Sequence, residues 1–296
     1  MISPHVLSRA ETRWRDLLAR RPDLSDAVAL QRQLVDRTSQ LADLLLQHDA
    51  ARDRLVPDAA ADNVQQGVPA FVGAAWTAGI RAAAPALDDF CNLLAEGGAG
   101  DPAVHVRDAL REGRIYPDTL VAASLARNRH AIACGAAQLG LAADLLWLIG
   151  ELCAAPVAAV ERDRLAVDGR IAEAVSRWKH GFCPFCGSWP AFAESARQHG
   201  QRTLRCSFCA AGWEAEGARC IHCGATEDLR IGLTDPAGSA SNIEACDKCR
   251  HYLKSLDVDS PTPPLLVPVE DLVSVDLDEA AAEAGYTRPT VQDWNA

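Results

Sequence analysis

Cys183-Pro-Phe-Cys-Gly-Ser-Trp-Pro190 contains the first of four cysteine pairs in which two residues separate the cysteines. Successive pairs are 19, 10 and 22 residues apart. In such a pair both sulfurs of a tight turn can face one metal ion, and backbone amides can support the thiolates. Because a tetrahedral site needs two pairs, four pairs predict two sites. The predicted metal ligands are Cys183, Cys186, Cys206, Cys209, Cys220, Cys223, Cys246 and Cys249.

The spacing also predicts which pairs share a metal ion. Gaps of 19 and 22 residues are long enough for a hairpin, whereas the gap of 10 fits a connector. We therefore expect the first pair to join the second and the third to join the fourth, as a degenerate internal repeat. The interleaved arrangement, first with third and second with fourth, is the alternative. Gly187 and Gly224 follow the leading pairs, where a positive φ would let amides face sulfur.

All-sulfur tetrahedral sites suit zinc or iron, and the ligands alone do not decide between the two metals. A closed four-thiolate site usually has a structural role, because it leaves no coordination position open for chemistry. His180, His222 and His251 lie near the cysteines, but eight sulfurs already complete two sites. We interpret these histidines as neighbours of the sites or surface residues, and Cys91, Cys134 and Cys153 as small buried apolar residues.

The remaining sequence indicates an α+β protein with three parts. Residues 1–178 show helical spacing and no alternating strand pattern, which predicts an all-helical N-terminal bundle. Within it, residues 139–152 form an apolar central helix, and Pro156 starts a further helix that ends near Trp178. Residues 179–254 carry two tandem rubredoxin-like or zinc-ribbon modules with short strands. Residues 255–296 form a linker, a short C-terminal helix over 269–285 and a tail.

Charge and hydropathy narrow the classes of function. The net charge is -11, and residues 171–254 hold 9 acidic and 10 basic side chains, so no basic patch predicts nucleic-acid binding. Lys179, Arg219, Lys248 and Arg250 flank the pairs and could offset thiolate charge or grip an acidic partner. The N-terminal sequence has no apolar signal region, and the apolar stretch 131–160 is interrupted by polar residues. We expect a cytoplasmic protein without a membrane span.

The cysteine-rich segments resemble the formate dehydrogenase accessory protein FdhE family. The resemblance is most specific in Arg177-Trp178 through Pro190, Leu204–Cys209 with Trp213, Arg219–Gly224 and Glu244–Lys254, and a further match runs from Glu270 to Tyr286. It implies a cytoplasmic assembly factor, not an enzyme, that acts on the catalytic subunit of respiratory formate dehydrogenase. It also implies rubredoxin-like iron at the two predicted sites.

Two other functions stay open from the sequence. A rubredoxin-like redox or electron-transfer protein would use iron in the same sites, but would not need the large helical part. A zinc-ribbon nucleic-acid-binding protein would need a basic surface with exposed aromatic residues. Self-association, the mechanism of assistance and the particular client are not decided by the sequence.

Overall fold

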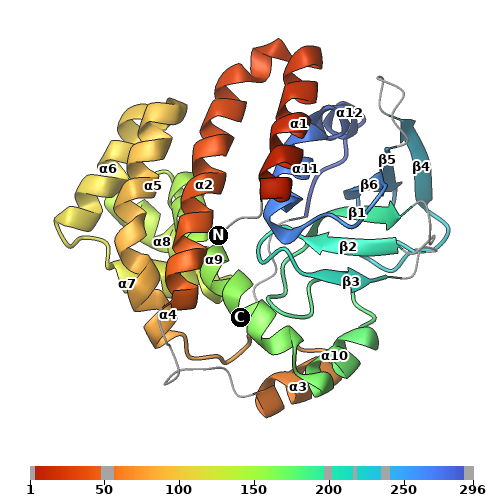
Figure 1. Ribbon diagram of the computed structural model, residues 1–296, viewed down its shortest axis with the longest axis horizontal. Coiled ribbons are helices and arrows are strands. Elements are labelled where there is room, and N and C mark those ends of the chain that lie inside the picture. Colours follow the sequence, from red (N-terminus) through yellow and green to blue (C-terminus); the bar gives the residue numbers. More distant parts are fainter. Residues whose placement is uncertain (1–3, 48–56, 197–201, 216–218, 235–240, 290–296) are drawn as a thin grey trace.

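The computed structural model describes residues 4–47, 57–196, 202–215, 219–234 and 241–289 (Figure 1). In the described part of residues 1–178, every regular element is helical, as predicted. The longer elements are α1 (Pro4–Arg20), α2 (Ser25–Gln47), α3 (Pro57–Gln65), α4 (Thr77–Ala83), α5 (Leu87–Leu94), α6 (Gly100–Arg111), α7 (Pro117–Leu125), α8 (Arg129–Leu139), α9 (Ala143–Ala166) and α10 (Gly169–Ser176).

Helix α9 is the centre of this part of the molecule. It contacts α2, α5, α7 and α8, and it is apolar on most sides. Among the described residues it is the one helix long and apolar enough to cross a membrane, yet 56% of its apolar window is buried inside the protein. The prediction that Pro156 starts a new helix is wrong, because Pro156 lies inside α9. The chain instead breaks at Asp168, whose carboxylate accepts hydrogen bonds from the amides of Arg170 and Ile171 and caps α10.

The second half of the chain forms one six-stranded sheet in the order β3-β2-β1-β6-β5-β4 (Figure 1). Each predicted ribbon supplies three consecutive strands with antiparallel pairing between neighbours. The parallel pairing of β1 with β6 then joins the two ribbons edge to edge. The strands are β1 (Pro190–Ala196), β2 (Arg202–Cys206), β3 (Gly212–Glu214), β4 (Leu229–Thr234), β5 (Asn242–Cys246) and β6 (Tyr252–Val258).

The C-terminal part packs back on both halves of the molecule. The single helix predicted over 269–285 is two helices, α11 (Val267–Val273) and α12 (Val275–Glu283), and β6 continues to Val258, past the predicted boundary at 254. Helix α11 packs on α1, and α12 packs on β4, β5 and β6. The predicted tail from residue 290 onward lies outside the described residues. The N-terminal helix and the sheet are therefore held together by the C-terminal helices.

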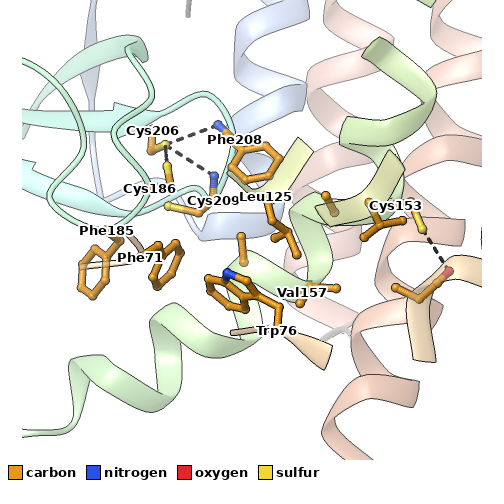
Figure 2. Packing of buried hydrophobic residues seen from close by; sticks show 14 of the residues in the cluster. Phe71, Trp76, Leu125, Cys153, Val157, Phe185, Cys186, Cys206, Phe208 and Cys209 are labelled. Atoms are coloured by element: carbon orange, nitrogen blue, oxygen red, sulfur yellow. Dashed lines mark hydrogen bonds between the residues drawn. The ribbon is translucent and has the colours of Figure 1, made fainter. Parts of the chain in front are cut away.

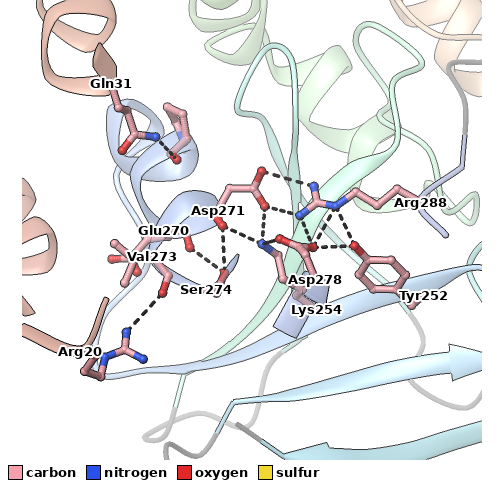
Figure 3. A network of polar contacts seen from close by, with 11 residues as sticks. Arg20, Gln31, Tyr252, Lys254, Glu270, Asp271, Val273, Ser274, Asp278 and Arg288 are labelled. Carbon is pink, nitrogen blue, oxygen red and sulfur yellow. Dashed lines mark hydrogen bonds and ion pairs between the residues drawn. The ribbon is translucent and has the colours of Figure 1, made fainter. Parts of the chain in front are cut away.

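A buried polar network fastens α11 and α12 to the sheet (Figure 3). Lys254 on β6 is fully buried, and its Nζ lies 2.6 Å from Asp271 Oδ1 and 2.9 Å from Asp278 Oδ2. Arg288 makes ion pairs of 2.7 Å with the same two carboxylates, and the Tyr252 hydroxyl donates to Asp278. Although burial opposes ionisation, Lys254 and Arg288 lower the pKa of Asp271 to about 2.

Candidate metal centres

The four cysteine pairs form four turns of one local design. In each turn the amide of the leading cysteine donates to the carbonyl five residues later: Cys183 to Ser188, Cys206 to Ala211, Cys220 to Ala225 and Cys246 to His251, at 2.7–3.0 Å. The residue after each second cysteine has a positive φ, between 57° and 76°: Gly187, Ala210, Gly224 and Arg250. This backbone turn brings amides toward sulfur. The amides of Phe185 and Phe208 lie 3.4 Å from the sulfurs of Cys183 and Cys206.

The sulfurs meet in two groups of four, in the sequential pairing. The first site contains Cys183, Cys186, Cys206 and Cys209, and the second site contains Cys220, Cys223, Cys246 and Cys249. In the first site, the Cys183–Cys209 and Cys186–Cys206 sulfurs are 3.6 and 3.4 Å apart. In the second, the Cys220–Cys249 and Cys223–Cys246 sulfurs are 3.7 and 3.6 Å apart. The interleaved alternative is therefore excluded as the arrangement of these sulfurs.

The two groups fit a tetrahedrally bound metal ion. Zinc–sulfur bonds of ~2.3 Å at tetrahedral angles place neighbouring sulfurs about 3.75 Å apart, close to the observed 3.4–3.7 Å. The four sulfurs of each group lie within 4.8 Å of one another. Amides directed at sulfur are the usual support of thiolate ligands. Each group could hold one ion, and sulfur ligation suits both zinc and iron.

Burial and the neighbouring thiols shift the pKa values of three first-site cysteines when no metal is bound. Burial raises a thiol pKa because it disfavours the charged thiolate. It raises the pKa of Cys183 and Cys209 well above the usual value for a thiol. For Cys186, burial acts in the same direction, but hydrogen bonds from the other three thiols and the charge of Arg127 outweigh it, and the pKa falls well below its usual value. Without a metal, the first site thus favours the neutral thiol at Cys183 and Cys209 and the thiolate at Cys186. A bound cation would be needed to stabilise four thiolates at this depth.

The first site is enclosed by the helical half of the protein (Figure 2). Its four cysteines are 0–3% exposed and belong to the same apolar core as Phe71, Trp76 and Leu125. The loop before α4 reaches the first turn directly, because the amides of Ala70 and Phe71 donate to the carbonyls of Pro184 and Phe185 at 2.8 and 2.9 Å. The core therefore continues from the helical bundle into the first ribbon.

Buried arginines surround the first site. Arg127, 2% exposed, lies in the turn between α7 and α8, and its guanidinium carbon is 4.0 Å from the ring centre of Phe208, between the cysteines of the second turn. Arg162 on α9 donates to the carbonyl of Cys209, and Arg205 on β2 donates to the carbonyl of Thr262. Each of these arginines also pairs with a carboxylate, that of Glu151, Asp163 or Glu194, so only part of their charge is left to offset the net charge of about −2 that four thiolates carry around a divalent ion.

The second site lies at the surface. Cys220 and Cys246 are buried, but Cys223 is exposed and Cys249 is half-buried. None of the four sulfurs belongs to an apolar core cluster of the described residues. A cavity of about 590 Å³ opens beside the site, and its lining includes Cys220, Gly224, His222, His251, Lys179 and Arg219.

The three predicted neighbouring histidines lie around this cavity. His180 and Phe182 have stacked rings with centroids 4.8 Å apart, and the rings of His222 and His251 are 5.5 Å apart. Both ring nitrogens of His222 are buried without a hydrogen-bond partner among the described residues. Burial, together with the nearby His251, lowers the pKa of His222 to about 4. None of the three histidines belongs to either group of four sulfurs.

The three remaining cysteines divide into two kinds. Cys91 and Cys153 are buried, as predicted, and burial raises the pKa of each thiol to about 12, which makes both thiols unreactive. The prediction for Cys134 is wrong, because it is exposed on α8 and its sulfur lies 3.5 Å from His130 Nε2. The helical repeat places it on the solvent side, since Ile132 and Ala136 occupy the buried face.

Several features of the site were not predicted from the sequence. Ala210 and Arg250 occupy the positive-φ position that glycine takes in the leading turns, although Arg250 had been named only for its charge; their place after a second cysteine is the signal that could have identified this backbone role. Arg127 and Arg162 lie far from any cysteine pair in the sequence, and Arg205, although it precedes Cys206, carries no signal that it is buried. Only the packing of α7, α9 and β2 around the first site reveals them.

The fold and the two cysteine groups define a class: a helical protein that carries tandem four-cysteine centres on one sheet. Its residues 218–293 match the family "FdhE, C-terminal domain". Similar proteins include "Protein FdhE homolog" of Shewanella baltica, 31% identical over 115 residues, and that of Pseudomonas aeruginosa, 34% identical over 132 residues. These matches cover 38% and 41% of this chain and span only 38% and 40% of the relatives' own length.

The structural likeness extends over the whole chain. The crystal structure of the FdhE protein from Pseudomonas aeruginosa matches with a TM-score of 0.61 and 25% identity, covering 99% of this chain and 96% of that one. The resemblance to the formate dehydrogenase accessory protein FdhE family, which the cysteine-rich segments indicated, is thus confirmed.

Proposed function

We propose that this protein is an accessory factor for the maturation of respiratory formate dehydrogenase, and that it binds the enzyme's catalytic subunit in the cytoplasm. The observation that carries the proposal is the combination of FdhE likeness over 99% of the chain with two complete groups of four cysteines. The protein itself would not be an enzyme. Closed four-thiolate sites leave no open coordination position for a substrate.

In this proposal the metal ions shape the docking surface. The eight cysteines would bind two ions, iron or zinc, and each ion would fasten two turns of one ribbon. Without an ion, the first site would bury sulfurs that cannot all ionise. Because structural metal sites contribute their binding free energy to folding, loss of an ion would loosen the ribbon and the surface it supports.

Capture of the catalytic subunit tests the proposal. Purified protein, immobilised at equal amounts, would be incubated with cytoplasmic extract containing the subunit. The variants are Cys183→Ser with Cys186→Ser at the first site, and Cys220→Ser with Cys223→Ser at the second. Cys134→Ser is the matched control, because it replaces an exposed cysteine outside both sites.

We expect capture by the wild type and by Cys134→Ser, and loss of capture in at least the first-site variant. Capture by neither the wild type nor the control would refute the docking function. Equal capture by all variants would be consistent with the docking function but would refute the proposal that the metal sites shape the docking surface.

Electron transfer is the second candidate function, and the surface position of the second site favours it. An iron ion held by Cys223 and Cys249 would lie near solvent, where a redox partner could approach. The test is the visible spectrum of the purified protein. Absorption that a mild reductant bleaches reversibly would support this function, whereas a colourless protein with two zinc ions would exclude it.

A further inference from the structure

We infer that the two metal sites have different roles. The first is a structural site that retains its metal ion, and the second is a site that exchanges thiophilic metal ions with solution. The inference rests on the metal binding in the proposed function. The two sites share ligands, spacing and turn geometry. A difference between them must therefore come from their surroundings.

Access to the ligands differs most. A chelator removes a metal ion by approaching the ion or a ligand sulfur, so the exposure of the sulfurs limits the rate. At the first site all four cysteines are 0–3% exposed. At the second, Cys223 is exposed and Cys249 is half-buried. Each site also borders a cavity: one of about 590 Å³ reaches Cys220 and one of about 460 Å³ reaches Cys186. The exposure of the cysteines, and not a cavity, therefore distinguishes the two sites.

The first site also costs more free energy to open to solvent than the second. Separation of Phe71 and its loop from the first turn would break two backbone hydrogen bonds and a shared apolar core. Local openings that break buried contacts are rare compared with motions at a surface. The second site needs no such opening, because Cys223 is already exposed.

The charges around the sites add to this difference. Arg127 and Arg162 are buried beside the first site, where charges are screened little, and each also pairs with a carboxylate, Glu151 or Asp163. The basic residues near the second site are at the surface, as Arg250 shows with a side chain that is 50% exposed. Water and salt screen such charges strongly.

The eleven cysteines of the chain allow the inference to be tested in one experiment. The full-length, metal-loaded protein would be treated with excess EDTA and sampled over time with pulses of iodoacetamide. Each thiolate freed of metal displaces iodide and forms a stable thioether, which peptide mass spectrometry assigns to its cysteine. Cys134 is the internal standard for an exposed thiol, and Cys91 and Cys153 report global unfolding.

We expect Cys134 to react at once and the four second-site cysteines to react next as a group. The four first-site cysteines should react at least tenfold more slowly, together with Cys91 and Cys153. Metal released into solution should show one fast and one slow equivalent. Equal labelling rates at the two sites, or faster labelling of the first, would overturn the inference.

The metal content before EDTA separates this failure from failure of the metal binding. Two ions per chain with equal release rates would refute the difference between the sites and leave metal binding intact. A chain that contains no metal, with the second-site cysteines labelled before any EDTA is added, would refute both.

Discussion

Phe71→Ala tests whether the helical half stabilises the first metal site. Phe71 is 6% exposed, its ring meets Trp76 edge-on with centroids 4.8 Å apart, and its centroid lies 6.1 Å from that of Phe185 inside the first cysteine turn. Truncation of a buried phenylalanine costs about 3–5 kcal/mol. Because the residue also has two aromatic neighbours, we expect a loss of about 4 kcal/mol, and a melting temperature lower by about 10 °C.

The measurement is urea unfolding of the metal-loaded protein at pH 7, followed by the EDTA and iodoacetamide experiment. The backbone hydrogen bonds of Ala70 and Phe71 remain possible in the variant, so the change isolates the side chain. First-site cysteines should be labelled at least tenfold faster than in the wild type, and second-site cysteines at an unchanged rate.

Tyr116→Ala is the matched control. It removes an aromatic ring that is 71% exposed, and we expect a change within about 0.5 kcal/mol and no effect on labelling. The free energies of unfolding of Phe71→Ala and of this control could differ by less than 1 kcal/mol, which is about the error of such a comparison. In that case the packing of the helical half does not stabilise the first site. The proposed origin of the difference between the sites would then be wrong.

Three further predictions concern the sheet and its connections. Lys254→Met should lower the free energy of unfolding by about 3 kcal/mol, because the carboxylates of Asp271 and Asp278 would keep only Arg288 as a counter-charge. A loss below 1 kcal/mol in thermal unfolding would contradict a stabilising role of this polar network. Acid should act through Asp271, whose pKa is about 2 in the folded protein and 3.8 ordinarily. The contribution of Asp271 to the free energy of unfolding, about 1–2 kcal/mol for a side chain 31% exposed, is complete above pH 4 and is lost as the pH falls to 2. The unfolding curves of Lys254→Met should therefore depend less on pH in this range. Gly181→Ala should destabilise the protein by at least about 2 kcal/mol, because its methyl group would lie 2.0 Å from the carbonyl oxygen of Ile221 in the second ribbon. Its control is Gly135→Ala in α8, whose methyl group meets nothing within 4 Å and should stabilise the protein by up to about 1 kcal/mol. Equal melting temperatures of the two variants would refute the close contact of the ribbons at this point.

Local chemistry made the cysteine turns predictable. Two-residue spacing, a following glycine and gaps of 19 and 22 residues indicated which pairs combine, and the sulfurs are grouped in that way. The positive φ of Gly187 and Gly224 was expected for the same local reason. The helical first half was also predictable, because its apolar residues recur at helical spacing.

Long-range packing explains the wrong predictions. Pro156 was expected to start a new helix, but α9 is held by apolar neighbours on most sides, and their packing outweighs the loss of one backbone hydrogen bond. The segment after 254 was read as a linker because of its prolines, yet β6 extends to Val258 along β1. No local sequence pattern predicts that a strand pairs in parallel with another strand 62 residues away, as Phe192 does with Lys254.

The sequence was sufficient to predict the grouping of the eight cysteines and the FdhE-like character, because each depends on residues close together in the chain. The joining of both ribbons in one sheet, the arginines around the first site and the exposure of Cys223 required the tertiary structure. Two sites with the same spacing are alike in sequence. They become different only when the helical core covers one of them and leaves the other at the surface, since burial and screening depend on segments that are far apart in the chain.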